Sequence, residues 1–292
     1  MPRWKTEQKF AKEIIKTVNT ASLYEGGVVL KISYKGDIAM LFDTHAHLND
    51  ERFDEDREEL LSSLKENGVD YYCEIAYDME SSFRAYELSQ KYDFIYSAVG
   101  VHPHDAKDLT EEDLPKLKDL LAKDKVVALG EIGLDYYYDN SERDVQRYWF
   151  ARQLELAKEV GMPVTIHSRD AMEDTINILK EHGTGDGIIH CYSGSKESAK
   201  ILLDMGYYIS FAGPVTFKNA NTALEVIKYV PEDRMLIETD SPYLAPVPYR
   251  GKRNCPIYVA EVAKKIAELK GKTFEEIANI TMKNAKRVYR IK

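Results

Sequence analysis

The chain has 292 residues, of which 44% are hydrophobic and 30% charged, and its formal net charge is −9 at pH 7. This composition is typical of a globular protein, and no apolar run is long enough to cross a bilayer. The negative net charge argues against tight binding to a long stretch of duplex nucleic acid, which needs many cationic contacts to phosphate. It is compatible with a small phosphate-binding pocket that has its own cations.

Residues 1–39 precede the regular pattern of the chain, and they begin with a charged stretch that lacks the apolar run of a signal peptide. We interpret them as an N-terminal extension and Met40 as the natural start. Lys35-Gly36-Asp37 can be encoded by a purine-rich ribosome-binding sequence shortly before the Met40 codon. The alternative is a genuine N-terminal helix and hairpin, and the nucleotide sequence decides between the two.

From residue 41 onwards, short apolar runs alternate with amphipathic stretches. The predicted strands cover 41–45, 70–76, 94–99, 126–131, 163–167, 187–190, 206–210 and 235–239. The predicted helices cover 53–67, 80–91, 111–122, 142–160, 170–182, 195–204, 218–229, 256–270 and 274–289. Eight strands alternating with helices predict an α/β fold with a parallel sheet, and eight strands close a (β/α)8 TIM barrel. We expect one barrel domain over 40–292 with extra C-terminal helices, with an open doubly wound sheet as the alternative.

Two histidines, His45 and His47, stand at the end of the first predicted strand. Residues two apart in a strand point to the same face, so both imidazoles can converge on one point. Such a pair can hold a metal ion, although two nearby histidines are more often incidental.

Four further polar residues fall at the ends of other predicted strands. Glu131 ends the fourth strand, His167 the fifth and His190 the sixth, and Asp240 follows the eighth. The C-terminal ends of barrel strands share one rim, where active sites lie. Each residue alone could be a core histidine, a helix cap or a turn, but together with the first-strand pair they predict a site for two divalent ions.

The three cysteines, Cys73, Cys191 and Cys255, are odd in number and widely spaced. This usage predicts free thiols in a reducing compartment, and we expect a cytoplasmic protein.

Six segments around these residues form a pattern of their own. They are Phe-Asp-Thr-His-Ala-His-Leu (42–48), Gly-Val-His-Pro-His (100–104), Gly-Glu-Ile-Gly-Leu-Asp-Tyr-Tyr (130–137), Ile-His-Ser-Arg-Asp-Ala (166–171), His-Cys-Tyr-Ser-Gly (190–194) and Glu-Thr-Asp-Ser-Pro-Tyr-Leu-Ala-Pro (238–246). At these segments the chain resembles the TatD family of metal-dependent hydrolases, within the amidohydrolase superfamily. The family pattern has no counterpart to residues 1–39.

The resemblance implies a distorted TIM barrel with a divalent-metal site and deoxyribonuclease activity. The implied ligands are His45, His47 and Asp240 for one ion and His167 and His190 for the other, with Glu131 bridging. Glu131 and Asp240 would be the catalytic carboxylates, and Asp240 would orient the attacking water and take its proton.

Five cationic or imidazole side chains are expected on the substrate phosphate: His102, His104, Arg169, Arg250 and Arg253. Plain surface solvation is the alternative for all five, including the 250–253 cluster. Asp135 and Tyr136 are expected to shape the pocket, and the tyrosine would either stack on a base or pack in the core.

The expected reaction is hydrolysis of phosphodiester bonds at the ends of single-stranded DNA by metal-activated water. The alternative is an ester or amide hydrolase of the same superfamily, such as an aminoacyl-tRNA deacylase, because a fold does not fix its function. An imidazole-rich site favours zinc, manganese, iron or nickel over magnesium, which prefers oxygen ligands. Single-stranded DNA or another phosphodiester is the expected partner, with no membrane and no obligate protein partner.

Overall fold

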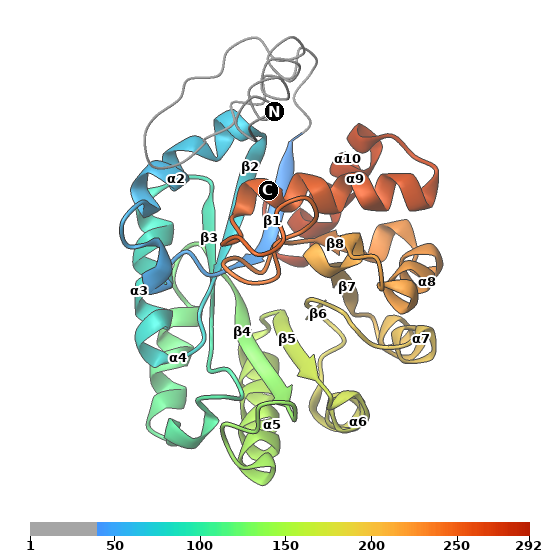
Figure 1. The fold of residues 1–292 in the computed structure, drawn as a ribbon. Coiled ribbons are helices and arrows are strands. Elements are labelled where there is room, and N and C mark those ends of the chain that lie inside the picture. The colour runs from blue at the N-terminus through green and yellow to red at the C-terminus, as the bar shows by residue number, and fades with distance from the viewer. Residues whose placement is uncertain (1–39) are drawn as a thin grey trace, which may run out of the picture.

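The computed structural model describes residues 40–292, so the interpretation of residues 1–39 lies outside the described part of the chain. Eight parallel strands form one sheet in chain order (Figure 1). The strands are β1 (Leu41–Ala46), β2 (Val69–Ile75), β3 (Ile95–Val99), β4 (Val126–Asp135), β5 (Val164–Arg169), β6 (Gly187–Ile189), β7 (Tyr208–Phe211) and β8 (Met235–Ile237). The predicted parallel sheet is confirmed.

Helices alternate with these strands and cover their outer side (Figure 1). The α-helices are α2 (Arg57–Ser63), α3 (Met79–Lys91), α4 (Asp113–Leu121), α5 (Arg143–Val160), α6 (Met172–His182), α7 (Lys196–Asp204), α8 (Asn221–Tyr229), α9 (Val259–Lys270) and α10 (Phe274–Val288). The described residues also form six 3-10 helices: η1 (Glu51–Phe53), η2 (Lys65–Asn67), η3 (Ala106–Asp108), η4 (Gly213–Thr216), η5 (Glu232–Arg234) and η6 (Pro256–Tyr258). Among the described residues, no helix combines the length and apolar character needed to cross a membrane.

The sheet closes almost completely into a barrel, because the chain just after β8 bonds to β1. The Asp240 N–H donates to the His45 carbonyl at 2.8 Å, and the His47 N–H donates to the Ser241 carbonyl at 2.7 Å. The Thr44 hydroxyl adds a bond of 3.0 Å to the Ile237 carbonyl. The TIM barrel is therefore confirmed over the open sheet, and the same bonds carry Asp240 towards the end of β1.

The last helix closes one end of this barrel. Residues such as Phe42, Ala98 and Leu236 point into the barrel and form a core cluster with Met282 and Val288 of α10. The neighbouring positions on the same strands point outwards to the surrounding helices, as the two-residue period of a strand requires. With α10 packed at this end, the opposite rim, where the strands end, stays available for a site.

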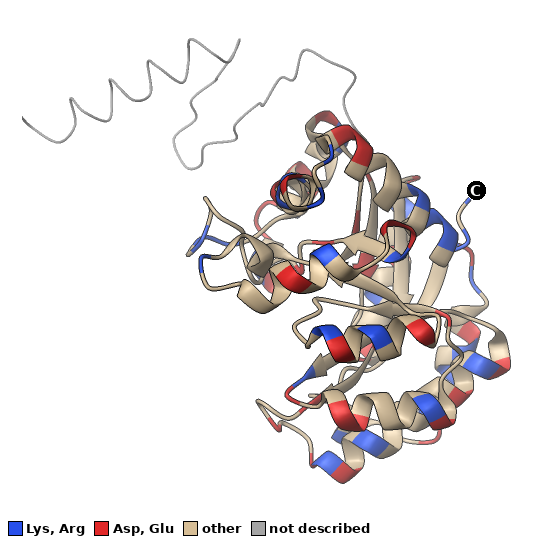
Figure 2. Cartoon of the chain, turned by 90° about the vertical axis from the view of Figure 1, so that its right-hand side faces the viewer, with Lys and Arg blue, Asp and Glu red and all other residues tan. Residues whose placement is uncertain are grey.

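Charged residues of both signs are interspersed along the helices on the side of the molecule that Figure 2 shows. Many pair within one helix, such as Arg84 with Glu80 at 2.8 Å and Lys264 with Glu261 at 2.8 Å. Mixed charge of this kind solvates these helices of the described chain and is a poor surface for duplex nucleic acid, which needs many cations.

β4 departs furthest from its predicted bounds, while β5 runs two residues past its predicted end, to Arg169, and β8 ends two residues before its predicted end, at Ile237. β4 continues to Asp135, so Glu131 lies inside the strand and not at its end, at a break in register against β5. The close pairing of β4 with β5 depends on Gly133, whose φ is +140°, because a Cβ at this position would overlap the His167 carbonyl oxygen.

Candidate metal centre

His45 and His47 end β1 side by side, with ring centroids 5.0 Å apart. The Nδ1 atom of His47 lies 2.9 Å from the Ile75 carbonyl of β2, which orients Nε2 towards the barrel axis. His45 is 1% exposed, and neither of its ring nitrogens has a hydrogen-bond partner. A buried imidazole without partners is costly, unless another group completes its coordination.

Glu131 lies between two sets of imidazoles and turns one oxygen to each. Its Oε2 lies 3.3 Å from His45 Nε2 and 3.7 Å from His47 Nε2. Its Oε1 lies 2.9 Å from His167 Nδ1 and 2.8 Å from His190 Nε2. One carboxylate thus touches both sets, as a ligand shared by two cations would.

Asp240 completes the first set from the loop after β8. Its Oδ1 lies 3.5 Å from His47 Nε2 and 3.8 Å from His45 Nε2. Its backbone has φ +58°, and its own N–H is bound by β1. The side chain is 13% exposed, more than those of His45 (1%) and Glu131 (5%), so it lies nearer the opening of the site.

A second layer of carboxylates holds the imidazoles of the other set. Asp135 Oδ2 lies 3.1 Å from His167 Nε2, and Glu238 Oε1 lies 3.2 Å from His190 Nδ1. Such partners fix the tautomer and the ring orientation of a metal-binding histidine. Sequence reasoning gave Glu238 no role, because its partner is 48 residues away along the chain.

His102, expected on the substrate phosphate, lies among the candidate ligands. It is 8% exposed, its Nε2 is 3.6 Å from Glu131 Oε1, and its ring centroid is 4.6 Å from that of His167. His104 lies one step outside, 3.1 Å from Asp135 Oδ2. His102 can therefore serve as a further nitrogen donor beside Glu131 and His167.

The described residues contain three groups whose donor atoms lie within 4.8 Å of one another. They are His45, His47 and Asp240; His45, Glu131 and His190; and His102, Glu131 and His167. The overlapping groups hold imidazole nitrogens and carboxylate oxygens, the donors that divalent transition metals prefer. Together with the two His45 ring nitrogens, which are buried without a hydrogen bond, this donor set fits a divalent metal.

The charges of the centre support the same fit. Burial opposes ionisation of Glu131, but the surrounding imidazoles, His190 foremost, hold the pKa of this carboxyl well below its usual range. Burial alone would lower the pKa of His47, yet the bond to Asp240 and the nearby carboxylates raise it to about 9. The carboxylates are thus ready as anionic ligands, and a metal ion has to displace a proton from His47.

The three arginines expected on phosphate have different surroundings. The Arg169 guanidinium lies over the ring of Tyr137, 4.0 Å from its centroid, beside the metal centre. That of Arg250 lies over Phe217 at 4.1 Å. Arg253 binds both oxygens of Asp56, at 2.8 and 2.5 Å. Arg253 also donates to the Arg52 carbonyl at 2.5 Å. Arg169 is linked to the candidate ligands through Asp135, which accepts from the Tyr137 N–H and contacts His167.

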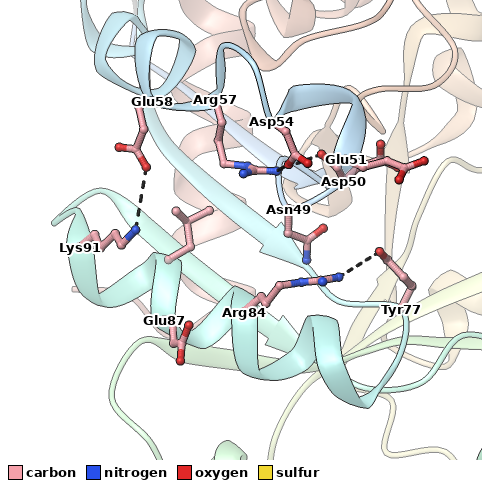
Figure 3. A pocket seen from close by; sticks show the side chains of 11 residues that line it. Asn49, Asp50, Glu51, Asp54, Arg57, Glu58, Tyr77, Arg84, Glu87 and Lys91 are labelled. Carbon is pink, nitrogen blue, oxygen red and sulfur yellow. Dashed lines mark hydrogen bonds and ion pairs between the residues drawn. The ribbon is translucent and has the colours of Figure 1, made fainter.

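A pocket of about 470 Å³ lies beside the centre, on the His47 side (Figure 3). Tyr77 lines it, and its ring centroid is 6.2 Å from that of His47. The lining holds five carboxylates and three cations, and several are paired, such as Lys91 with Glu58 at 3.9 Å. The surplus of negative charge makes this pocket a poor path for a phosphate chain.

A near-closed parallel barrel with a buried histidine and carboxylate cluster at its rim defines a metal-dependent hydrolase of the amidohydrolase superfamily. The family described as TatD related DNase matches residues 42–290. The chain belongs to the TatD family.

Known relatives agree with this assignment. The metal-dependent hydrolase YabD of Bacillus subtilis is 55% identical over 254 residues, covering 86% of this chain and 100% of the relative. The 3'-5' ssDNA/RNA exonuclease TatD of Pectobacterium parmentieri is 32% identical, covering 86% and 100%. The crystal structure of the TatD homologue YJJV from Escherichia coli matches with a TM-score of 0.83 at 31% identity, covering 87% of this chain and 100% of that chain.

Proposed function

We propose that this protein is a nuclease that uses two divalent ions to hydrolyse phosphodiester bonds at the ends of single-stranded DNA. The observation that carries the proposal is the position of Glu131, whose two oxygens face two separate sets of imidazoles. A shared carboxylate between two nitrogen-rich sets is the arrangement that a two-ion hydrolase needs.

In this proposal His45, His47 and Asp240 hold one ion, His167 and His190 hold the other, and Glu131 binds both. His102 gives the second ion an additional nitrogen donor. When bound, the ions supply charge stabilisation at the phosphoryl oxygens and lower the pKa of a water molecule.

Asp240 is the proposed base. Burial opposes its ionisation, but the bond to His47 and the charges of the other imidazoles hold its pKa below the usual range. The carboxylate is therefore ionised at neutral pH and can accept a proton. Its 13% exposed side chain lies nearer the opening than that of Glu131, where a substrate phosphate arrives.

Two lines of support favour a nucleic-acid substrate. A relative that matches over its whole length is named for exonuclease action on single-stranded DNA and RNA. Arg169, next to the centre, gives the rim a cation for one or two phosphates. A net charge of −9 disfavours a longer phosphate track, so the free end of a strand is the fitting substrate.

The test is a substrate panel with metal analysis on one preparation. Protein purified without added metal is analysed for bound elements and then given end-labelled single-stranded DNA, RNA, aminoacyl-tRNA and a simple carboxylic ester. We expect about two transition-metal ions per chain and stepwise release of nucleotides from DNA, abolished by chelation. Cleavage of the aminoacyl or carboxylic ester with intact DNA overturns the proposal in favour of an esterase, and an empty or magnesium-only site overturns the assigned metal class.

A further inference from the structure

Exposed apolar side chains gather at the rim of the metal centre. Of the nine large apolar residues exposed in the described part of the chain, five lie on the loops that follow β4 and β8. They are Tyr137, Tyr138, Tyr243, Leu244 and Val247. Exposed aromatic rings beside a site mark a surface for a ligand more often than chance exposure does.

The first part of this rim is fixed to the metal centre. The backbone N–H groups of Tyr137 and Tyr138 donate to Asp135 Oδ1 at 3.0 and 2.9 Å. The other oxygen of Asp135 contacts His167 and His104 at 3.1 Å each. The Tyr137 and Tyr138 side chains are 58% and 55% exposed. The Asp135 carboxylate therefore fixes the position of two exposed rings relative to the candidate ligand His167.

Arg169 covers both rings of this part. Its guanidinium carbon lies 4.0 Å from the Tyr137 centroid and 4.8 Å from the Tyr138 centroid. Across the described residues its side chain has no hydrogen bond or ion pair. A guanidinium that lies on rings through its flat face keeps its N–H edges available for a phosphate.

The second part lies on the His47 side. The Tyr243 ring is 47% exposed, and its centroid is 6.2 Å from that of His47. The Arg52 guanidinium lies 4.3 Å above this ring and is held by Asp50 at 2.8 and 2.7 Å. The Tyr243 N–H donates to the Asp240 carbonyl at 2.8 Å, which ties this ring too to a candidate ligand.

We infer that the two tyrosine–arginine surfaces, Tyr137–Tyr138–Arg169 and Tyr243–Arg52, bind unpaired nucleobases on the two sides of the scissile phosphate. This inference rests on the proposed nuclease function and names what that site recognises. Every base has a π face, so stacking on tyrosine or guanidinium holds a strand without reading its sequence. A base within a duplex is already stacked on its neighbours, so these surfaces select single strands.

The test measures KM and kcat for a short single-stranded oligonucleotide with the metal-loaded enzyme. Removing the rings in Y137A/Y138A or in Y243A should raise KM about 5- to 150-fold, which is the range expected when one base loses its stacking contact. The kcat value should change far less. Phenylalanine at the same positions keeps the ring and should restore KM to within about twofold of the wild type. Tyr148→Ala removes a 51% exposed tyrosine from α5 and serves as the matched control.

Abasic substrates separate stacking from other effects. A strand that lacks the two bases next to the cleaved bond should bind wild type and Y137A/Y138A equally weakly. If the wild type cleaves DNA but the alanine variants keep its KM, or lose as much on the abasic strand as on the intact one, the base-binding surfaces are excluded while the nuclease function stands. If the wild type cleaves no nucleic acid, the proposed function itself fails.

Discussion

In the proposed mechanism Asp240 has two roles, as a metal ligand and as the general base. It contacts both β1 histidines through Oδ1, and it is the carboxylate of the first set that lies nearest the opening. Asp240→Asn keeps the volume and the backbone bonds but loses the basic oxygen. We expect kcat to fall by about 10²- to 10⁴-fold, the usual contribution of a general base, with unchanged circular dichroism.

Asp204→Asn is the matched control, because Asp204 is an exposed carboxylate of α7 paired with Lys200 at 2.5 Å. It should keep full activity. Undiminished hydrolysis by Asp240→Asn would contradict the assigned base.

Glu74 is a buried carboxyl outside the ligand groups. Burial raises its pKa from 4.5 to about 7, although the Tyr72 hydroxyl and the Asn49 N–H donate to it. The folded state therefore prefers the protonated form. The free energy of unfolding should therefore decrease as the pH rises from about 4.5 to about 7, by an amount on the order of 3 kcal/mol.

Glu74→Gln removes this titration and keeps an oxygen for the Asn49 N–H. Its stability relative to the wild type should therefore increase from pH 4.5 to pH 7, as measured by urea unfolding at several pH values. A stability difference that stays constant over this range would exclude a raised pKa at Glu74.

At the scale of elements, the pairing of β4 with β5 sets the distance between Glu131 and His167. Gly133 pairs with His167, and a Cβ on it would overlap the His167 carbonyl oxygen. Gly133→Ala should push β5 away, lower the content of bound metal and reduce the melting temperature. Metal analysis and calorimetry measure both effects.

Gly161→Ala is the control for this prediction. Gly161 also has a positive φ, +69°, but no atom lies within 4 Å of its would-be Cβ. That variant should lose only about 1 kcal/mol to backbone strain and keep its metal. Equal metal loss in both variants would mean that close strand pairing is not the cause.

The loop between β8 and α9 is joined to the segment before α2 by Arg253 and Asp56. Their side chains are 35% and 40% exposed, so solvent screens the pair and we expect no more than about 0.5 kcal/mol from it. If Arg253 acts through this pair alone, Arg253→Ala and Asp56→Ala should change KM for DNA equally and by less than about twofold. A KM increase in Arg253→Ala alone would instead assign Arg253 to the substrate phosphate.

At the scale of the whole molecule, the sequence predicted the eight strands and brought six polar residues to one rim. Apolar runs mark buried strands, and the ends of parallel strands meet at one edge, so His45, Glu131 and His190 could be grouped without coordinates. The number of strands predicts a closed barrel, but the bonds that close it, such as Asp240 to His45, join distant parts of the chain and could not be identified from the sequence. Two further contacts could not be predicted for the same reason. His102 lies close to Glu131, and Glu238 contacts His190, although each pair is far apart in the sequence.

A metal ion at this rim would connect strands from both sides of the barrel, so binding should stabilise the entire domain. Metal at about 1,000 times its dissociation constant adds about 4 kcal/mol, which raises the melting temperature of a domain of this size by roughly 8–16 °C. The comparison is a calorimetric scan of metal-loaded protein against chelated protein. His182→Ala, on α6, leaves the candidate ligands intact and should show the same difference as the wild type.

The size of this difference should depend on pH through His47. Its raised pKa means that, without metal, its proton stabilises the fold fully below pH 6.5, and this contribution is lost as the pH rises through about 9. A metal ion needs the neutral imidazole, so it competes with that proton less at higher pH. The melting-temperature difference between loaded and chelated protein should therefore widen from pH 6.5 to pH 9, whereas a constant or narrowing difference would mean that His47 loses no proton when metal binds.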